Sequence, residues 1–62
     1  MKISLKAARI NAGLTQSEAA EQFGVSVSTI KNWESGKTFP TPPQIDKIVE
    51  VYRVAYDNIK FF

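Results

Sequence analysis

Two helix patterns in the middle of this 62-residue chain are separated by only three residues. The first pattern opens with Thr15 and Glu18, which have the spacing of a capping box, and it ends at Gly24. The second pattern follows Ser26, a good N-cap residue, and ends at Gly36. Because the connection is so short, the two helices must lie against each other, and this constrains the fold more than any other feature.

The residue types around the three-residue turn are those that two closely crossing helices require. Gly24 accepts the positive φ of a sharp turn, and Ala20 is small enough to let the helices approach. Ile30 and Trp33 lie at positions from which they fill the angle between the helices and the space beneath it. The sequence therefore predicts a helix-turn-helix over about residues 16–35.

Further helix patterns flank this segment. Residues 5–12 repeat apolar positions at helical spacing, and residues 42–52 carry an amphipathic stripe behind a Thr-Pro-Pro-Gln start. Ile59 and Phe62 fit one face of a short fifth helix, although no Gly or strong cap precedes it. Strand patterns are weak throughout. We therefore predict an all-α fold, a compact bundle of four to five helices forming the single domain 1–62.

The second helix of the predicted pair has a polar outer face. With its apolar residues facing the core, a wheel at 100° per residue places Ser28, Asn32 and Ser35 opposite, with Lys31 beside them. Asn can bond adenine through two hydrogen bonds, Ser can contact either kind of base, and Val27 can meet a thymine methyl group. This face is suited to the major groove of DNA.

Composition limits the other function classes. The net charge is only +2, with all of the excess in residues 1–37, so charge alone does not indicate a nucleic-acid partner. The chain has no Cys and no His, which removes the common nucleophile–base pairs and most transition-metal sites. We expect no enzyme activity, metal, cofactor or small-molecule ligand. With no membrane-spanning run, we expect a cytoplasmic protein.

Across roughly residues 3–52 the chain resembles the phage Cro/repressor-type (XRE-like) helix-turn-helix family, whose fold is the lambda-repressor-like DNA-binding domain. The resemblance rests on the following segments: Leu5-Lys6-Ala7-Ala8-Arg9, Gly13-Leu14-Thr15-Gln16, Ala20, Gly24-Val25-Ser26, Thr29-Ile30, Trp33-Glu34 and Gly36. It implies a regulator of transcription that binds double-stranded operator DNA. It also implies a homodimer on near-palindromic sites. Because 62 residues leave no room for a second domain, we expect a stand-alone Cro-like regulator, with a fragment of a longer repressor as the alternative.

The resemblance further implies roles for individual residues. Base edges would be contacted by Val27, Ser28, Lys31 and Asn32. Phosphates would be contacted by Gln16, Ser26, Thr29, Lys37 and Thr38. Arg9 and Glu34 match the inter-helix ion pair of the family, which we expect to be mainly structural. Because cations are few, we expect a shallow dependence of affinity on salt.

Two departures from the family pattern concern the core and the C-terminal segment. Ala19 stands where the family usually has a larger apolar residue, so Phe23 or Ile10 would fill the space or the core would be thinner. Arg53 and Ala55 replace the usual Gly-like turn and polar cap before the last helix.

The C-terminal aromatic residues allow two uses. Tyr52, together with Ile59, would complete the core, whereas exposed terminal Phe residues would favour dimerisation through this end. The alternative to DNA binding is a helical protein-binding module, such as an antirepressor- or antitoxin-like partner with the same fold. Such a module would carry apolar anchors on the outer face of residues 27–35, where Ser and Asn lie instead.

Overall fold

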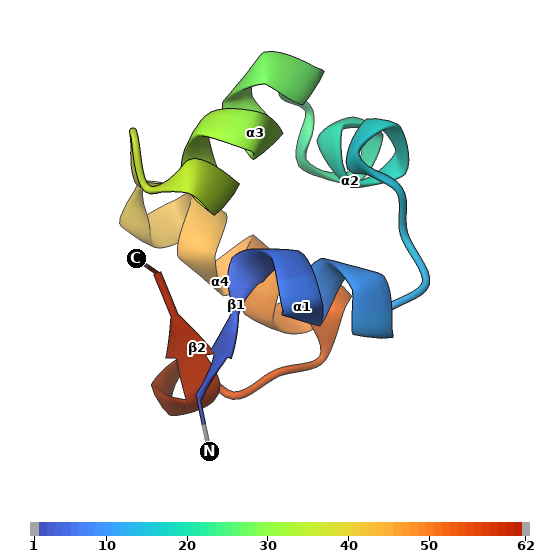
Figure 1. The fold of residues 1–62 in the computed structure, drawn as a ribbon. Helices are drawn as coiled ribbons and strands as arrows, with labels where there is room; N and C mark the ends of the chain where they lie inside the picture. The colour runs from blue at the N-terminus through green and yellow to red at the C-terminus, as the bar shows by residue number, and fades with distance from the viewer. Residues whose placement is uncertain (1, 62) are drawn as a thin grey trace.

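A computed structural model of the protein describes residues 2–61, and the fold within this range is mostly helical (Figure 1). The helices are α1 (Leu5–Asn11), α2 (Gln16–Phe23), α3 (Val27–Ser35) and α4 (Pro42–Tyr52). A 3₁₀ turn, η1 (Tyr56–Asn58), and two short strands, β1 (Ile3–Ser4) and β2 (Ile59–Lys60), complete the described chain. The predicted all-α class is confirmed, with four α-helices among the described residues.

Side-chain caps explain why the helices begin where they do. The hydroxyls of Ser4, Thr15 and Ser26 each accept a hydrogen bond from the backbone N–H three residues on, at 3.0, 3.1 and 3.2 Å. Glu18 completes the predicted capping box by accepting from the Thr15 N–H at 2.9 Å. At the start of α4, the Gln44 side chain likewise accepts a hydrogen bond from the N–H of the cap residue Thr41 at 2.8 Å. The predicted helix starts are confirmed.

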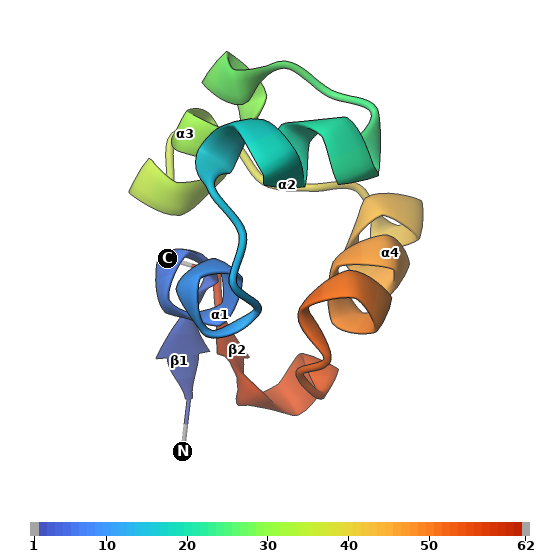
Figure 2. The same ribbon diagram turned by 90° about the vertical axis from the view of Figure 1, so that its right-hand side faces the viewer.

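The hydrophobic core lies between the α2–α3 pair and the α1–α4 pair. Figures 1 and 2 show α1 and α4 beneath α2 and α3, with the two strands beside α1. The buried apolar side chains come from every α-helix and from β2: Leu5, Ala8, Ala19, Ala20, Ile30, Trp33, Ile48, Tyr52 and Ile59. The predicted core positions of Tyr52 and Ile59 are therefore confirmed.

Phe23, one of the two residues expected to compensate for the small side chain of Ala19, packs against the hydrophobic core. The Phe23 ring packs 5.4 Å from the Tyr52 ring and 6.1 Å from the Trp33 ring, measured between centroids. Ile10, the other residue expected to fill this space, is 55% exposed. Of the two candidates, Phe23 is therefore the one that packs against the core, where it makes an edge-to-face contact with Tyr52.

The predicted fifth helix is wrong. Arg53 ends α4 with a φ of +56°, a single 3₁₀ turn follows, and Ile59 then enters an extended strand. This strand pairs in parallel with β1, Ile59 opposite Ile3 and Lys60 opposite Ser4. Pairing with β1 gives backbone N–H and C=O groups of this segment hydrogen-bond partners, and Ile59 becomes buried. No pattern of neighbouring residues indicates this pairing. Phe62, the other residue assigned to that helix, lies outside the described residues.

Candidate nucleic-acid interface

The α2–α3 pair has the short, sharp turn that the sequence predicts. Gly24 adopts a φ of +67°, in the left-handed region, and the Val25 N–H donates to the Ala20 carbonyl at 3.0 Å. Ala20 is 4% exposed and Ile30 is 1% exposed, so both lie in the crossing. The turn ends α2 and begins α3 without intervening loop, which fixes the outer face of α3 relative to the start of α2.

The outer face of α3 carries the side chains predicted to contact bases. Ser28 and Lys31 are exposed and Asn32 is half-buried, whereas Val27 is half-buried and packs against the hydrophobic core. Within residues 2–61, the side chains of Ser28, Lys31 and Asn32 make no hydrogen bond or ion pair to the rest of the protein. Their polar groups are therefore available to a ligand.

The backbone carbonyl of Asn32 organises the loop that follows α3. It accepts hydrogen bonds from the N–H groups of Lys37 and Thr38, at 3.0 and 3.3 Å, and from the Ser35 hydroxyl at 3.2 Å. Gly36, which ends α3 with a φ of +80°, donates its N–H to the Trp33 carbonyl at 3.3 Å. As a result Lys37 and Thr38, both exposed, lie directly beside the C-terminal end of α3.

The N-terminal ends of α2 and α3 carry the remaining residues predicted to contact phosphates. Ser26 is exposed and Thr29 is half-buried, and their hydroxyl oxygens lie 3.0 Å apart. Gln16 is the first residue of α2 and is half-buried. In the described chain, the N–H groups of Gln16 and Ser17 have no hydrogen-bond partner, as is usual in the first turn of a helix. Such a helix start attracts anions.

A buried ion pair connects α1 to the C-terminal end of α3. Arg9 Nε donates to Glu34 Oε2 at 2.7 Å, and the two side chains are 9% and 8% exposed. Arg9 Nη1 also donates to the Leu14 carbonyl at 2.9 Å. The guanidinium is therefore satisfied inside the protein, which agrees with the structural role expected for this pair.

The Glu34 carboxylate has a further partner that the sequence did not suggest. Gln16 Nε2 donates to Glu34 Oε1 at 3.2 Å, which joins the start of α2 to the end of α3. The two residues are 18 positions apart, and no local pattern relates positions on different helices at that separation. Burial raises the pKa of the nearby Tyr52 to about 12, and Glu34 adds to this rise while Arg9 opposes it.

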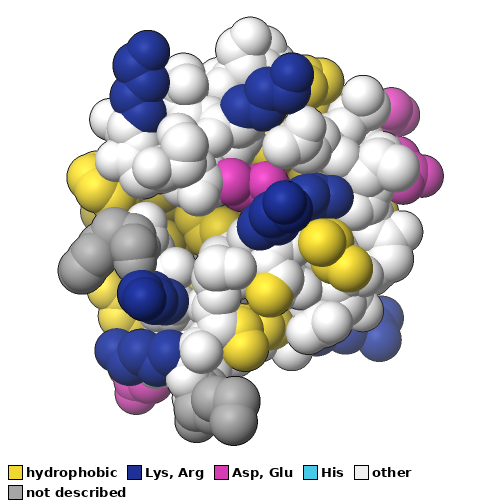
Figure 3. All heavy atoms as spheres, viewed as in Figure 1, with side chains coloured by type: hydrophobic (Ala, Val, Ile, Leu, Met, Phe, Trp, Pro, Cys, Tyr) yellow, Lys and Arg dark blue, Asp and Glu magenta, His cyan; other side chains and the backbone are white. Residues whose placement is uncertain are grey.

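Positive charge is dispersed on the face of the molecule that Figure 3 shows. Figure 3 shows Lys and Arg side chains at several separate positions, without a continuous basic patch. The net charge of +2 agrees with this view. Contacts to an anionic ligand would therefore depend on a few cations together with neutral donors and backbone N–H groups.

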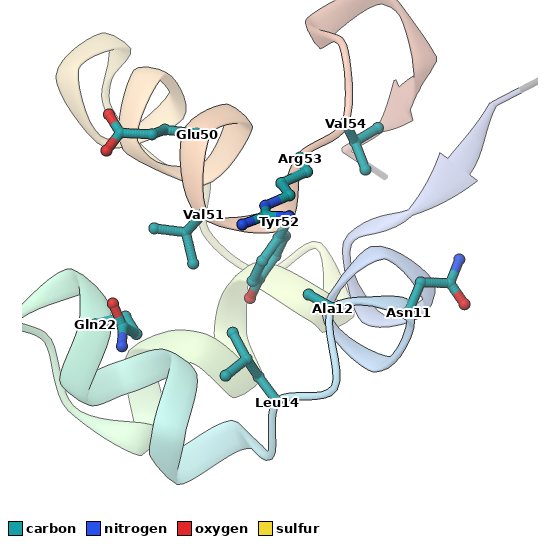
Figure 4. Close-up of a pocket in the computed structure, with 9 residues that line it drawn as sticks. All are labelled: Asn11, Ala12, Leu14, Gln22, Glu50, Val51, Tyr52, Arg53 and Val54. Atoms are coloured by element: carbon teal, nitrogen blue, oxygen red, sulfur yellow. The ribbon is translucent and has the colours of Figure 1, made fainter.

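A separate hollow lies away from α3, where the ends of α1 and α4 approach α2 (Figure 4). Val51 and Tyr52 of α4 and Leu14 of the α1–α2 turn project into it, and Gln22 lies at its border. None of its lining residues belongs to α3. It is therefore distinct from the surface described above.

The α2–turn–α3 geometry and the polar outer face of α3 define a helix-turn-helix domain. The family model described as helix-turn-helix matches residues 5–59, and the chain belongs to this family, the XRE-like class predicted from its sequence. Comparison with solved structures gave no match. Among the described residues, no helix is long and apolar enough to cross a membrane.

Two curated proteins are similar to this chain. One is the HTH-type transcriptional activator BcrR of Enterococcus faecalis, 36% identical over 55 residues, which are 89% of this chain and 27% of that protein. The other is the cryptic phage CTXphi transcriptional repressor RstR of Vibrio cholerae serotype O1, 31% identical over 45 residues, which are 73% of this chain and 40% of that protein. The chain thus matches only a minor part of each relative.

Proposed function

We propose that this chain binds double-stranded DNA with sequence specificity and regulates transcription, as a Cro-like or repressor-like regulator of a phage, prophage or bacterium. The observation that carries this proposal is the outer face of α3. Ser28, Lys31 and Asn32 there have no partner among the described residues, and the α2 crossing holds the helix in one orientation. The names of the two relatives, an activator and a repressor, support regulation of transcription as the role.

In the proposed complex α3 lies in the major groove. Asn32, Ser28 and Lys31 contact base edges. Val27 meets a thymine methyl group. A polar face of this kind favours DNA over the alternative partner, a protein, because a protein interface would centre on apolar or aromatic anchors.

Phosphate contacts flank the groove in this arrangement. Gln16 and the first N–H groups of α2 bind one phosphate, and Lys37 and Thr38 beside the end of α3 bind another. The hydroxyls of Ser26 and Thr29, at the start of α3, lie near a phosphate on the other side of the groove. Such contacts set the register of the protein on the duplex but carry no sequence information.

We further propose that two copies bind adjacent half-sites. Half-sites one helical turn apart are centred about 34 Å from each other. The longest dimension of this domain, measured over its Cα atoms, is 28 Å, so two copies fit side by side.

Selection of bound duplexes from a random pool tests the proposal. A sequence-specific regulator enriches one related set of sites, and a dimer enriches sites with two-fold symmetry. Analytical ultracentrifugation with and without the selected duplex then gives the number of copies bound. Equal retention of all duplexes, or of none, would contradict sequence-specific binding, and a single isolated half-site would contradict the symmetric dimer.

A further inference from the structure

The amide group of Gln16 is held by a buried carboxylate before any ligand is bound. Glu34 Oε1 receives the Gln16 Nε2 donor at 3.2 Å, and the same oxygen lies 3.4 Å from Arg9 Nη2. Glu34 Oε2 receives Arg9 Nε at 2.7 Å. One carboxylate therefore joins residues of α1, α2 and α3.

The chemistry of this contact fixes which way the amide faces. An ionised carboxylate only accepts hydrogen bonds, so Gln16 must present its NH₂ group to Glu34 and not its carbonyl oxygen. The NH₂ group has two hydrogens, and Glu34 Oε1 takes one of them. The second N–H has no partner among the described residues, and the backbone N–H groups of Gln16 and Ser17 at the start of the same helix are also unpaired. All three are donors, and a phosphate oxygen requires donors.

We propose that Glu34 is a positioning residue for phosphate binding: by holding the Gln16 amide in one orientation, it directs the free N–H of that amide toward the DNA backbone. The inference rests on the proposed function. The Arg9 contacts hold the Glu34 carboxylate in place, so the ion pair affects the proposed interface through Gln16.

The proposal predicts an effect opposite in sign to ordinary electrostatics. Glu34 is an anion close to a surface that would bind a polyanion, so removing its charge should by itself tighten DNA binding. If Glu34 positions Gln16, removing the carboxylate weakens binding instead. Glu21, an exposed carboxylate of α2, provides the matched control, because Glu21→Gln removes the same charge without a contact to Gln16.

The test is a cycle of substitutions measured against a selected duplex and an unrelated duplex. Gln16→Ala should lower the association constant about three- to tenfold on both duplexes, because the contact is to phosphate. Glu34→Gln should lower it by a similar factor, whereas Glu21→Gln should leave it unchanged or raise it. In a background of Arg9→Met with Glu34→Met, which replaces the buried pair by apolar side chains and keeps the fold, Gln16→Ala should have less than a twofold effect.

A loss on Gln16→Ala that is equal in both backgrounds overturns the positioning role and leaves the proposed function intact. Absence of any effect of Gln16→Ala also overturns it. If the unmodified protein binds no duplex, the proposed function fails and this inference fails with it. A second measurement uses the free protein: ¹⁵N relaxation should show the Gln16 side-chain amide to be more restricted than that of Gln22, an exposed residue of the same helix. Equal mobility of the two amides would contradict the proposal.

Discussion

Arg9 and Glu34 form a buried ion pair across 25 positions of the chain, with 2.7 Å between Nε and Oε2. The pair joins α1 to the end of α3 and therefore sets the orientation of the proposed recognition helix relative to the core. A charge buried in this way is costly once its partner is removed, because it can no longer be solvated.

Removal of one member of this pair should destabilise the protein strongly. Arg9→Ala should lower the free energy of unfolding by about 3–5 kcal/mol, since Glu34 would be left buried and unpaired. The combined change Arg9→Met with Glu34→Met should cost much less, because two apolar side chains pack in the same volume. Urea denaturation followed by circular dichroism measures both. Equal losses for the single and combined variants would show that the charges are not coupled.

Asn32→Ala should reduce both affinity and specificity. The loss of binding free energy on the preferred site should be about 1–3 kcal/mol. Discrimination between bases should be lost at one position only, because an Asn side chain pairs with a single base. Titrations with the preferred duplex and with duplexes changed at single positions measure this pattern. Asn11→Ala, at an exposed position at the end of α1, is the matched control and should bind as the unmodified protein does. A uniform loss across all duplexes would place Asn32 at the phosphates instead.

Two left-handed backbone positions should respond in opposite directions to substitution. Gly24→Ala places a side chain at a φ of +67° and should lower stability by about 1 kcal/mol, although no atom lies within 4 Å of the new Cβ. Arg53 already adopts a φ of +56°, so Arg53→Gly should raise stability by up to about 1 kcal/mol. Thermal unfolding of both variants tests this. A destabilised Arg53→Gly would mean that the side chain contributes more than the strain costs.

Stability should fall in alkaline solution through Tyr52. Its pKa is raised from 10.0 to about 12 in the folded protein, first by burial and then by Glu34. The unfolded chain therefore loses this proton at lower pH than the folded chain, and the folded state loses stability as the pH rises from 10 to 12. Tyr52→Phe should remove that part of the dependence. Denaturation at several pH values between 9 and about 12 gives the comparison, and parallel profiles for the two proteins would be the contrary result.

The sequence predicts the parts of this fold that depend on local chemistry. Caps such as Thr15, the turn at Gly24 and the inward positions of Ile30 and Trp33 all follow from the residue and its near neighbours. For the same reason the outer face of α3 could be derived from a helical wheel before its surroundings were known.

The parts that depend on distant residues could not be predicted in this way. The pairing of Ile59 with Ile3 joins opposite ends of the chain, and a two-residue strand is too short to show alternation. The αL conformation of Arg53, where the chain leaves α4 for η1, is likewise not indicated by the residue type. The hydrogen bond from Gln16 to Glu34 is of the same kind, since it arises only once α2 and α3 have crossed.

Contact between the outer face of α3 and DNA can be tested residue by residue. The backbone amide resonances of the protein are assigned, and the selected duplex is then added stepwise. Binding through α3 should give the largest shift changes in residues 27–32 and 37–38 and at the start of α2, with small changes in α4 and β2. Large changes confined to α4, η1 and β2, with α3 unaffected, would contradict it.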